Sequence, residues 1–209
     1  LYSNTSGYSN IAIGTTALGS NTTGVVNNAI GFQALSSNAA GNNNNAFGNN
    51  TLGANTNGNT NSAMGASALL LNTIGNSNVA VGASALLNNN TRSNLVAVGD
   101  SALFNSVSAN GNTAIGSKAL FSTVSGSSNT ALGFQSLYSN TGSGNTATGY
   151  QTLNNATTGA GNSAYGYRAL YSNITGYDNT VSGERAAFNN TNGNTNTVIG
   201  EAALFSNSS

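Results

Sequence analysis

The chain lacks several residue types on which protein chemistry commonly depends. Its 209 residues include no histidine, cysteine, proline or tryptophan, and only four basic and four acidic side chains. Charged residues make up 4% of the chain, against about 25% in ordinary soluble domains. Without histidine and cysteine, the commonest general base and the most reactive nucleophile are both missing. Disulfides and thiolate metal sites are excluded as well.

These absences narrow the function classes that we expect. A serine or threonine nucleophile would need Lys118 or one of the few carboxylates as its base, so we expect no catalytic site. We also expect no metal site and no cofactor. The chain has no basic patch for nucleic acid or anionic lipid, and no run of about 18 apolar residues that would span a membrane. We therefore expect neither a nucleic-acid partner nor membrane insertion.

What the chain does contain is a repeat, which should be sought before any other feature. The pattern N-x-A-x-G recurs along its length, and we call its last residue the closing glycine. The closing glycines are Gly14, Gly31, Gly48, Gly65, Gly82, Gly99, Gly116, Gly133, Gly149, Gly166, Gly183 and Gly200. Every step between them is 17 residues except one of 16, which indicates a shortened turn in "YSNTG", residues 138–142. A disordered low-complexity tract would drift in spacing, and the frequent glycines would break helices.

Other positions repeat with the closing glycine. Asparagine stands four residues before it, alanine two before, a larger apolar residue directly before, and leucine four after. The alternation in N-x-A-x-G predicts a short strand, and we expect A-L to lead into a second one. Asparagines stacked at about 4.8 Å should form hydrogen bonds between their side chains. A second glycine column, seven residues before the closing glycine, should supply turns with positive φ.

The sequence therefore predicts an all-β fold, a parallel β-roll or β-solenoid of about twelve 17-residue coils. We expect residues 1–209 to form one repetitive segment of a longer fibre protein. The leucine and the apolar residue before the closing glycine should fill a thin core. The alanine and glycine columns should then form a face of small residues on which another chain packs, and we favour three such rods around a common axis.

Particular motifs resemble known fibrous proteins. "NVAVG" (78–82), "NTAIG" (112–116) and "NTVIG" (196–200) resemble the N-S-V-A-I-G repeats in head domains of YadA-type trimeric autotransporter adhesins. "NTALGFQSLYSNTGSGNTATGYQTL" (129–153) is similar to repeats of bacterial and phage tail-fibre-like proteins, many of which end in an endosialidase-type chaperone domain. The resemblance implies a left-handed coil, a homotrimer, and an extracellular place in a cell-surface fibre or a virion tail fibre. The 17-residue period is longer than that of the adhesin heads, which leaves the coil shape open.

The favoured function is a structural rod of a trimeric extracellular fibre, adhesin or tail-fibre-like, that mediates attachment to a surface or host. The alternative is an adhesive surface that binds cell-surface glycan or a host receptor through stacked aromatic columns. Its candidate glycan-contact residues are Phe134, Tyr150, Tyr167, Gln135, Gln151 and Arg168. Aromatic rings can stack on sugars while glutamine and arginine donate hydrogen bonds, and repeated sites would add avidity. The simpler interpretation is that the rings stack on each other and stiffen the rod.

Two further patterns complete the prediction. A column of hydroxyls, formed by Thr113, Thr130, Thr146, Ser163, Thr180 and Thr197, suggests an ice-binding protein as a third class. The same column is mixed in the first half of the chain, so we rank ice binding below the other two. Charged residues soon after the closing glycine, such as Arg168, Glu184 and Arg185, are expected to pair across coils at a solvated corner. Such pairs contribute about 0–1 kcal/mol each.

Overall fold

The structure, a computed structural model, describes residues 1–208, and these contain twelve three-residue strands and no helix. The chain divides into two compact units, Leu1–Val107 and Ser108–Ser209. The first unit contains β1 (Ile11–Ile13), β2 (Asn28–Ile30), β3 (Asn45–Phe47), β4 (Ser62–Met64), β5 (Val79–Val81) and β6 (Val96–Val98). The second contains β7 (Thr113–Ile115), β8 (Thr130–Leu132), β9 (Thr146–Thr148), β10 (Ser163–Tyr165), β11 (Thr180–Ser182) and β12 (Thr197–Ile199).

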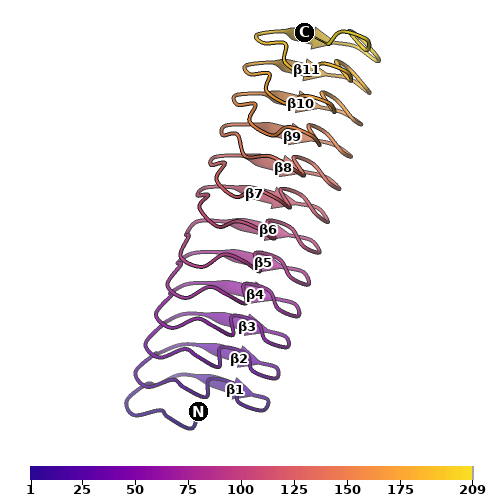
Figure 1. The fold of residues 1–209 in the computed structure, drawn as a ribbon. Coiled ribbons are helices and arrows are strands. Elements are labelled where there is room, and N and C mark those ends of the chain that lie inside the picture. The colour runs from indigo at the N-terminus through magenta and orange to yellow at the C-terminus, as the bar shows by residue number, and fades with distance from the viewer. Residues whose placement is uncertain (209) are drawn as a thin grey trace. The chain divides into compact units, whose positions relative to one another are not determined.

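Each unit is a parallel β-solenoid in which one coil carries one strand. Consecutive strands within a unit pair in parallel, so that Ala29 of β2 lies opposite Ala12 on one side and Ala46 on the other. After the strand the chain turns, runs back on the opposite side of the coil, and turns again into the next strand (Figure 1). We call the residues three to eight places after the closing glycine the return segment. The predicted coil of 17 residues is confirmed.

The single 16-residue step leaves the stacking intact. Thr130 of β8 pairs with Thr146 of β9, which keeps the strands in register across the shortened coil. The Asn140 side chain donates to the carbonyl of Gly142, two residues on, whereas Asn55 reaches Gly58 over three residues. The missing residue is therefore taken from the turn, as the sequence predicts, and the strand registers on both sides are preserved.

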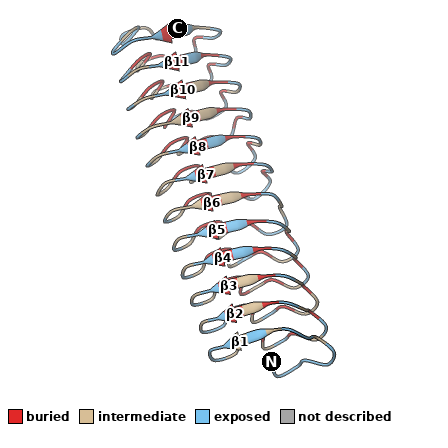
Figure 2. Ribbon diagram, turned by 180° about the vertical axis from the view of Figure 1, so that it is seen from behind, coloured by how far each residue is buried: buried red, intermediate tan, exposed pale blue. Residues whose placement is uncertain are grey.

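The core is thinner than the sequence predicts. The leucine of the return segment is fully buried in most coils, as at Leu35 and Leu137, and it packs against the alanine columns, which are buried as well. Figure 2 shows that buried residues recur at the same places in successive coils. The residue before the closing glycine, which we expected in the core, instead faces outward, and Met64 is 54% exposed. The narrow space between strand and return segment accommodates leucine opposite alanine, and no second large side chain.

The columns of small residues do not form an external face. Ala29 and Ala46 are fully buried inside the coil. A Cβ added to Gly65 would lie 2.6 Å from the carbonyl oxygen of Gly82 in the next coil, so the closing glycines are needed where successive coils meet. The prediction that another chain packs on an alanine and glycine face is therefore wrong. These residues are small because the coil interior and the contact between coils leave no room.

Backbone conformation explains why each coil has only one strand. The second strand expected at A-L does not form, because Leu35 has a φ of 49° and lies in the left-handed region. The closing glycines also have positive φ, as Gly65 does at 128°. The second glycine column differs from our expectation, because Gly58 is not among the residues with positive φ. A Cβ there would lie 2.5 Å from the carbonyl oxygen of Gly75, so close approach excludes a side chain.

The predicted asparagine ladder is confirmed. The side-chain nitrogen of Asn44 donates to Oδ1 of Asn27 at 3.1 Å, and that of Asn61 donates to Oδ1 of Asn44 at 3.1 Å. Each of these side chains also donates to a backbone carbonyl, such as Gly58 for Asn44 at 2.8 Å. Buried polar groups need such partners to offset the water that they lose. The ladder thus replaces part of the apolar core that each coil lacks.

A second ladder, which the sequence analysis missed, lies in the return segment of the first unit. Asn38 donates to Asn21 and Asn55 donates to Asn38, both at 2.8 Å, and the row continues to Asn89. These asparagines stand seven residues after the closing glycine, a spacing that was visible in the sequence. At Ser106 the asparagine is replaced, and the buried serine hydroxyl has no hydrogen-bond partner among residues 1–208.

Candidate glycan-contact surface

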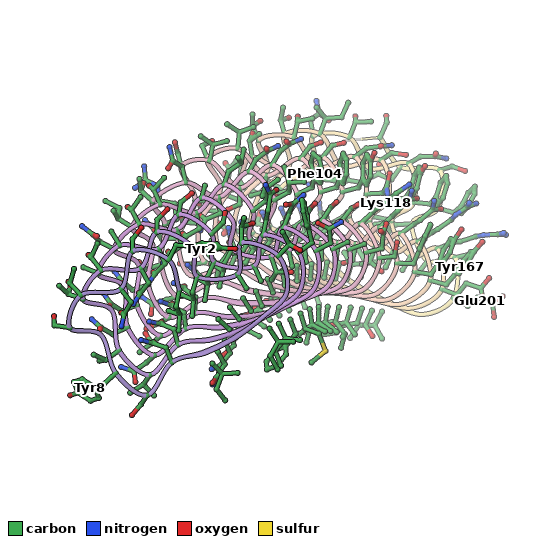
Figure 3. All side chains as sticks on the ribbon, turned by 90° about the horizontal axis from the view of Figure 1, so that it is seen from below. Tyr2, Tyr8, Phe104, Lys118, Tyr167 and Glu201 are labelled. Atoms are coloured by element: carbon green, nitrogen blue, oxygen red, sulfur yellow. The ribbon has the colours of Figure 1, made fainter. Side chains whose placement is uncertain are left out.

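The six predicted contact residues lie where three strands of the second unit end. Phe134, Tyr150 and Tyr167 directly follow the closing glycines after β8, β9 and β10. Gln135, Gln151 and Arg168 come next, each with a φ of 51–52°. Because the coils repeat in register, the structure brings these side chains together as two adjacent columns. Figure 3 shows all side chains on the ribbon, and Tyr167 of the aromatic column projects outward from it.

The aromatic column is a stack of rings. The ring centres of Phe134 and Tyr150 are 5.3 Å apart with 15° between their planes, and those of Tyr150 and Tyr167 are 5.3 Å apart with 9° between their planes. Both faces of Tyr150 are therefore covered by its neighbours. The ring edges face solvent, because Tyr150 is 41% and Tyr167 38% exposed. A sugar would meet edges and hydroxyls at Tyr150 rather than an open ring face, which favours the simpler interpretation of stacking within the solenoid.

The polar column is a directional row of hydrogen bonds. Nε of Arg168 donates to Oε1 of Gln151 at 2.8 Å, and Nε2 of Gln151 donates to Oε1 of Gln135 at 2.7 Å. The guanidinium carbon of Arg168 lies 5.3 Å from the ring centre of Tyr167 and 5.6 Å from that of Tyr171. Such cation–π contacts contribute about 0.5–1 kcal/mol at exposed sites. Arg168 thus takes an amide and two rings as partners, and the expected pairing with Glu184 across coils is wrong.

A second set of stacked rings lies in the return segments of the second unit. Tyr171 and Phe188 have ring centres 5.1 Å apart, and Phe188 and Phe205 have centres 5.2 Å apart. The column is interrupted at Asn154, whose buried side chain donates to the carbonyl of Gln135 at 2.9 Å. This asparagine therefore ties the return segment to the turn that carries the candidate surface.

The predicted hydroxyl column opens the strands of the second unit. Thr113 of β7 and Ser163 of β10 are half-buried, and Thr130 of β8 is exposed. Strand alternation places them on the same outward face as the residue before the closing glycine. That second position holds Ile115 and Leu132 but also Thr148, so the face combines hydroxyl and apolar groups. Ice binding stays a prediction.

A metal site and a membrane-spanning helix are both absent from the described residues. Among residues 1–208, no three His, Cys, Asp or Glu side chains lie close enough together to hold a metal ion. The same part of the chain has no helix of the length and apolar character required to cross a membrane. The chain matches no protein-family model, no curated protein and no solved structure. The likeness to adhesin heads and tail fibres therefore rests on the motifs alone.

Proposed function

We propose that this chain is a structural segment of an extracellular fibre, that it assembles as a homotrimer, and that the fibre mediates attachment to a surface or host. The observation that carries the proposal is an exposed apolar column on the strands of the first unit. The column is formed by the residues directly before the closing glycines, namely Ile13, Ile30, Phe47, Met64 and Val81, whose exposed fractions range from 36% to 58%. We call it the strand-face column.

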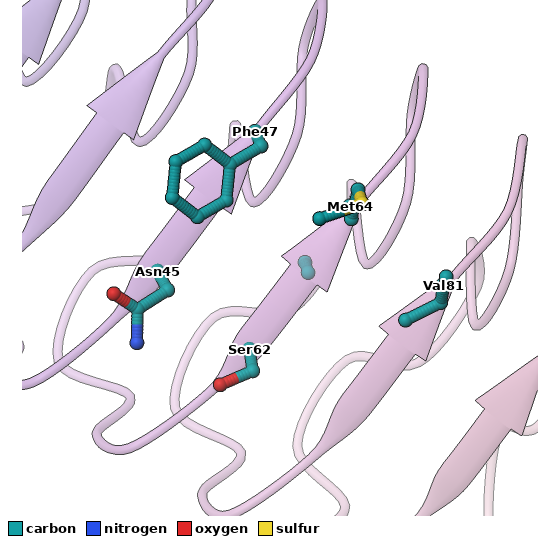
Figure 4. Close-up of a pocket in the computed structure, with 6 residues that line it drawn as sticks. Asn45, Phe47, Ser62, Met64 and Val81 are labelled. Atoms are coloured by element: carbon teal, nitrogen blue, oxygen red, sulfur yellow. The ribbon is translucent and has the colours of Figure 1, made fainter.

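The strand-face column has the character of an interface. Phe47, Met64 and Val81 lie on the same face of three neighbouring strands, beside a shallow groove of about 280 Å³ that Asn45 and Ser62 also line (Figure 4). No charged residue lines this groove. Contiguous exposed apolar surface on a folded chain commonly marks a site of association. A core of leucine, alanine and asparagine leaves one coil little other apolar burial, so association would supply what the single chain lacks.

The partner that fits best is another copy of the chain. A column that repeats once per coil is matched by a second column with the same repeat, and copies related by rotation present the same face to a common axis. The number three, the extracellular location and the role in attachment are supported by the resemblance to trimeric adhesin heads and tail fibres. Because the small residues are buried, the proposed trimer interface lies on the exposed strand-face column instead.

Cross-linking tests this interface directly, because the chain contains no cysteine. In Met64→Cys the new thiol would lie on the strand-face column, where a short bismaleimide should join chains within the trimer. Ser37→Cys is the matched control, since Ser37 is an exposed residue of a return segment. We expect cross-linked chains with Met64→Cys and none with Ser37→Cys. Equal cross-linking at both positions, or none at either, contradicts the proposed interface.

A second candidate function is glycan recognition at the six-residue surface of the second unit. The observation in its favour is the row Gln135–Gln151–Arg168, which runs beside exposed tyrosine edges. Recognition there would depend on hydrogen bonds to tyrosine hydroxyls and to the polar row. Replacing both Tyr150 and Tyr167 by alanine tests it, because a glycan array should lose binding while the circular dichroism spectrum stays the same.

A further inference from the structure

A shallow groove of about 320 Å³ crosses four return segments of the second unit. One side is formed by residues six places after the closing glycine, Ser139, Asn155 and Ser172. The other side is formed by residues eight places after it, Thr157, Ile174 and Thr191. We call this feature the return-segment groove. It contains none of the six predicted glycan-contact residues, and it lies on the opposite run of the coil from the strands.

The backbone N–H groups beside the groove already form hydrogen bonds within the solenoid. The N–H groups of Ser139, Asn155 and Ser172 donate to carbonyls of the next coil at 3.1–3.2 Å, and the acceptors are Asn154, Tyr171 and Phe188. The hydroxyls of Thr157 and Thr191 likewise donate to carbonyls of the next coil. An extended peptide could therefore not pair with these N–H groups as an added strand, because such pairing requires free backbone groups.

The side chains on one side of the groove remain available to a ligand. The hydroxyls of Ser139 and Ser172 and the amide of Asn155 form no hydrogen bond to any of residues 1–208. Opposite them, Ile174 is 46% exposed and the threonine methyl groups add further apolar surface. No charged residue lines the groove. The fitting ligand is thus neutral, with hydroxyl groups for the serine and asparagine side chains and C–H surface for Ile174 and the threonine methyl groups.

The groove repeats once per coil, so a linear ligand that fits it should have a repeating unit as long as the spacing between coils. Successive coils are stacked at about 4.8 Å, and stacked rings in the second unit are 5.1–5.3 Å apart. An extended β-1,4-linked polysaccharide advances by nearly this length per sugar. We propose that the return-segment groove binds a neutral, linear β-1,4-linked polysaccharide, with successive sugars placed on successive coils. This proposal depends neither on the trimer nor on the aromatic surface.

Calorimetric titration with cello-oligosaccharides, from disaccharide to hexasaccharide, tests the proposal. Affinity should rise with length until the sugars span the groove, and then level off. β-1,3-linked gluco-oligosaccharides of the same lengths should bind at least about tenfold more weakly, a difference of roughly 1.4 kcal/mol, because their chains curve away from the line of coils. Equal affinity for the two linkages, or no binding of any cello-oligosaccharide, would overturn the proposal.

Matched variants locate the binding. Ser172→Trp should fill the groove and weaken hexasaccharide binding at least about tenfold. Ser37→Trp, at the same place in a coil of the first unit, should leave affinity unchanged, and so should the double tyrosine variant. Should Ser172→Trp disturb the circular dichroism spectrum, Asn155→Ala removes the amide without adding bulk and should still weaken binding several-fold. Unchanged affinity in Asn155→Ala, or in a folded Ser172→Trp, would overturn the assignment to this groove.

Discussion

Replacing Asn44 by alanine should destabilise the first unit far more than an ordinary polar-to-alanine change. The Asn44 side chain is fully buried and takes part in four hydrogen bonds. It donates to Asn27 and to the carbonyl of Gly58, and its Oδ1 accepts from the backbone N–H and the side chain of Asn61. Alanine removes all four at once.

The hydrogen-bond partners of Asn44 are not affected equally by the substitution, and the loss in the free energy of unfolding is the sum of these separate effects. The backbone N–H of Asn61 has Asn44 as its acceptor and would be left buried without a partner, which costs about 1–3 kcal/mol. The other three partner groups each keep a second hydrogen bond, so each loss contributes roughly 0.5 kcal/mol, at the low end for a hydrogen bond. The free energy of unfolding should therefore fall by roughly 3 kcal/mol.

Urea denaturation followed by circular dichroism measures this change. Asn49→Ala is the matched control, because Asn49 is exposed in the same unit and its side chain forms no hydrogen bond within residues 1–208. The control should shift the free energy of unfolding by less than about 0.5 kcal/mol. If Asn44→Ala behaves like Asn49→Ala, the buried asparagine ladder does not stabilise the fold and the energetic reasoning is wrong.

Three further predictions concern the 17-residue coil, the closing glycines and the hydroxyl column. Deleting residues 66–82 removes one whole period, so the shortened chain should fold, whereas deleting residues 66–71 should cause aggregation or local unfolding. Solubility and circular dichroism distinguish the two variants. Equal behaviour of both would refute the 17-residue coil as the structural unit. Gly65→Ala should lower the free energy of unfolding, measured by thermal melts, by about 2–4 kcal/mol. The added Cβ would clash with the backbone of Gly82, and Gly65 has a positive φ that alanine rarely adopts. Gly19→Ala is the control and should have a smaller effect. Thermal hysteresis should be absent in solutions of the chain, since apolar residues interrupt the hydroxyl face; strong hysteresis would instead support ice binding.

Much of the architecture follows from spacing alone. A fixed period forces equivalent residues of successive coils into register, so the strands at N-x-A-x-G and the ladder through Asn27 and Asn44 could be predicted without knowing the coil shape. The turn that absorbs the 16-residue step could be located for the same reason. The stacking of Phe134, Tyr150 and Tyr167 was also predictable, because each ring follows a closing glycine.

The direction of side chains within a coil could not be predicted in the same way. Alternation places Ala63 and Met64 on opposite faces of β4, but it does not say which face is inside. The usual preference for burying the larger residue gives the wrong answer here, because Leu69 already fills the narrow interior. Left-handed φ at leucine was equally hidden, since leucine rarely adopts it and only the closure of the coil imposes it.

The candidate surface shows the same limit. Sequence spacing brought Gln135, Gln151 and Arg168 together correctly, yet it could not reveal that their side chains form a row of hydrogen bonds with each other. The return-segment groove was not anticipated at all, because serine, threonine and asparagine recur throughout the chain and these residues line one groove only through their place in the coil.

The mass of the assembled chain tests the proposed function most directly. The account predicts that light scattering of the purified protein at micromolar concentration gives three times the 20.7 kDa of one chain, with a circular dichroism spectrum of a folded β protein. A well-folded monomer of 20.7 kDa would show that the exposed strand-face column needs no second copy, and it would contradict the trimeric fibre.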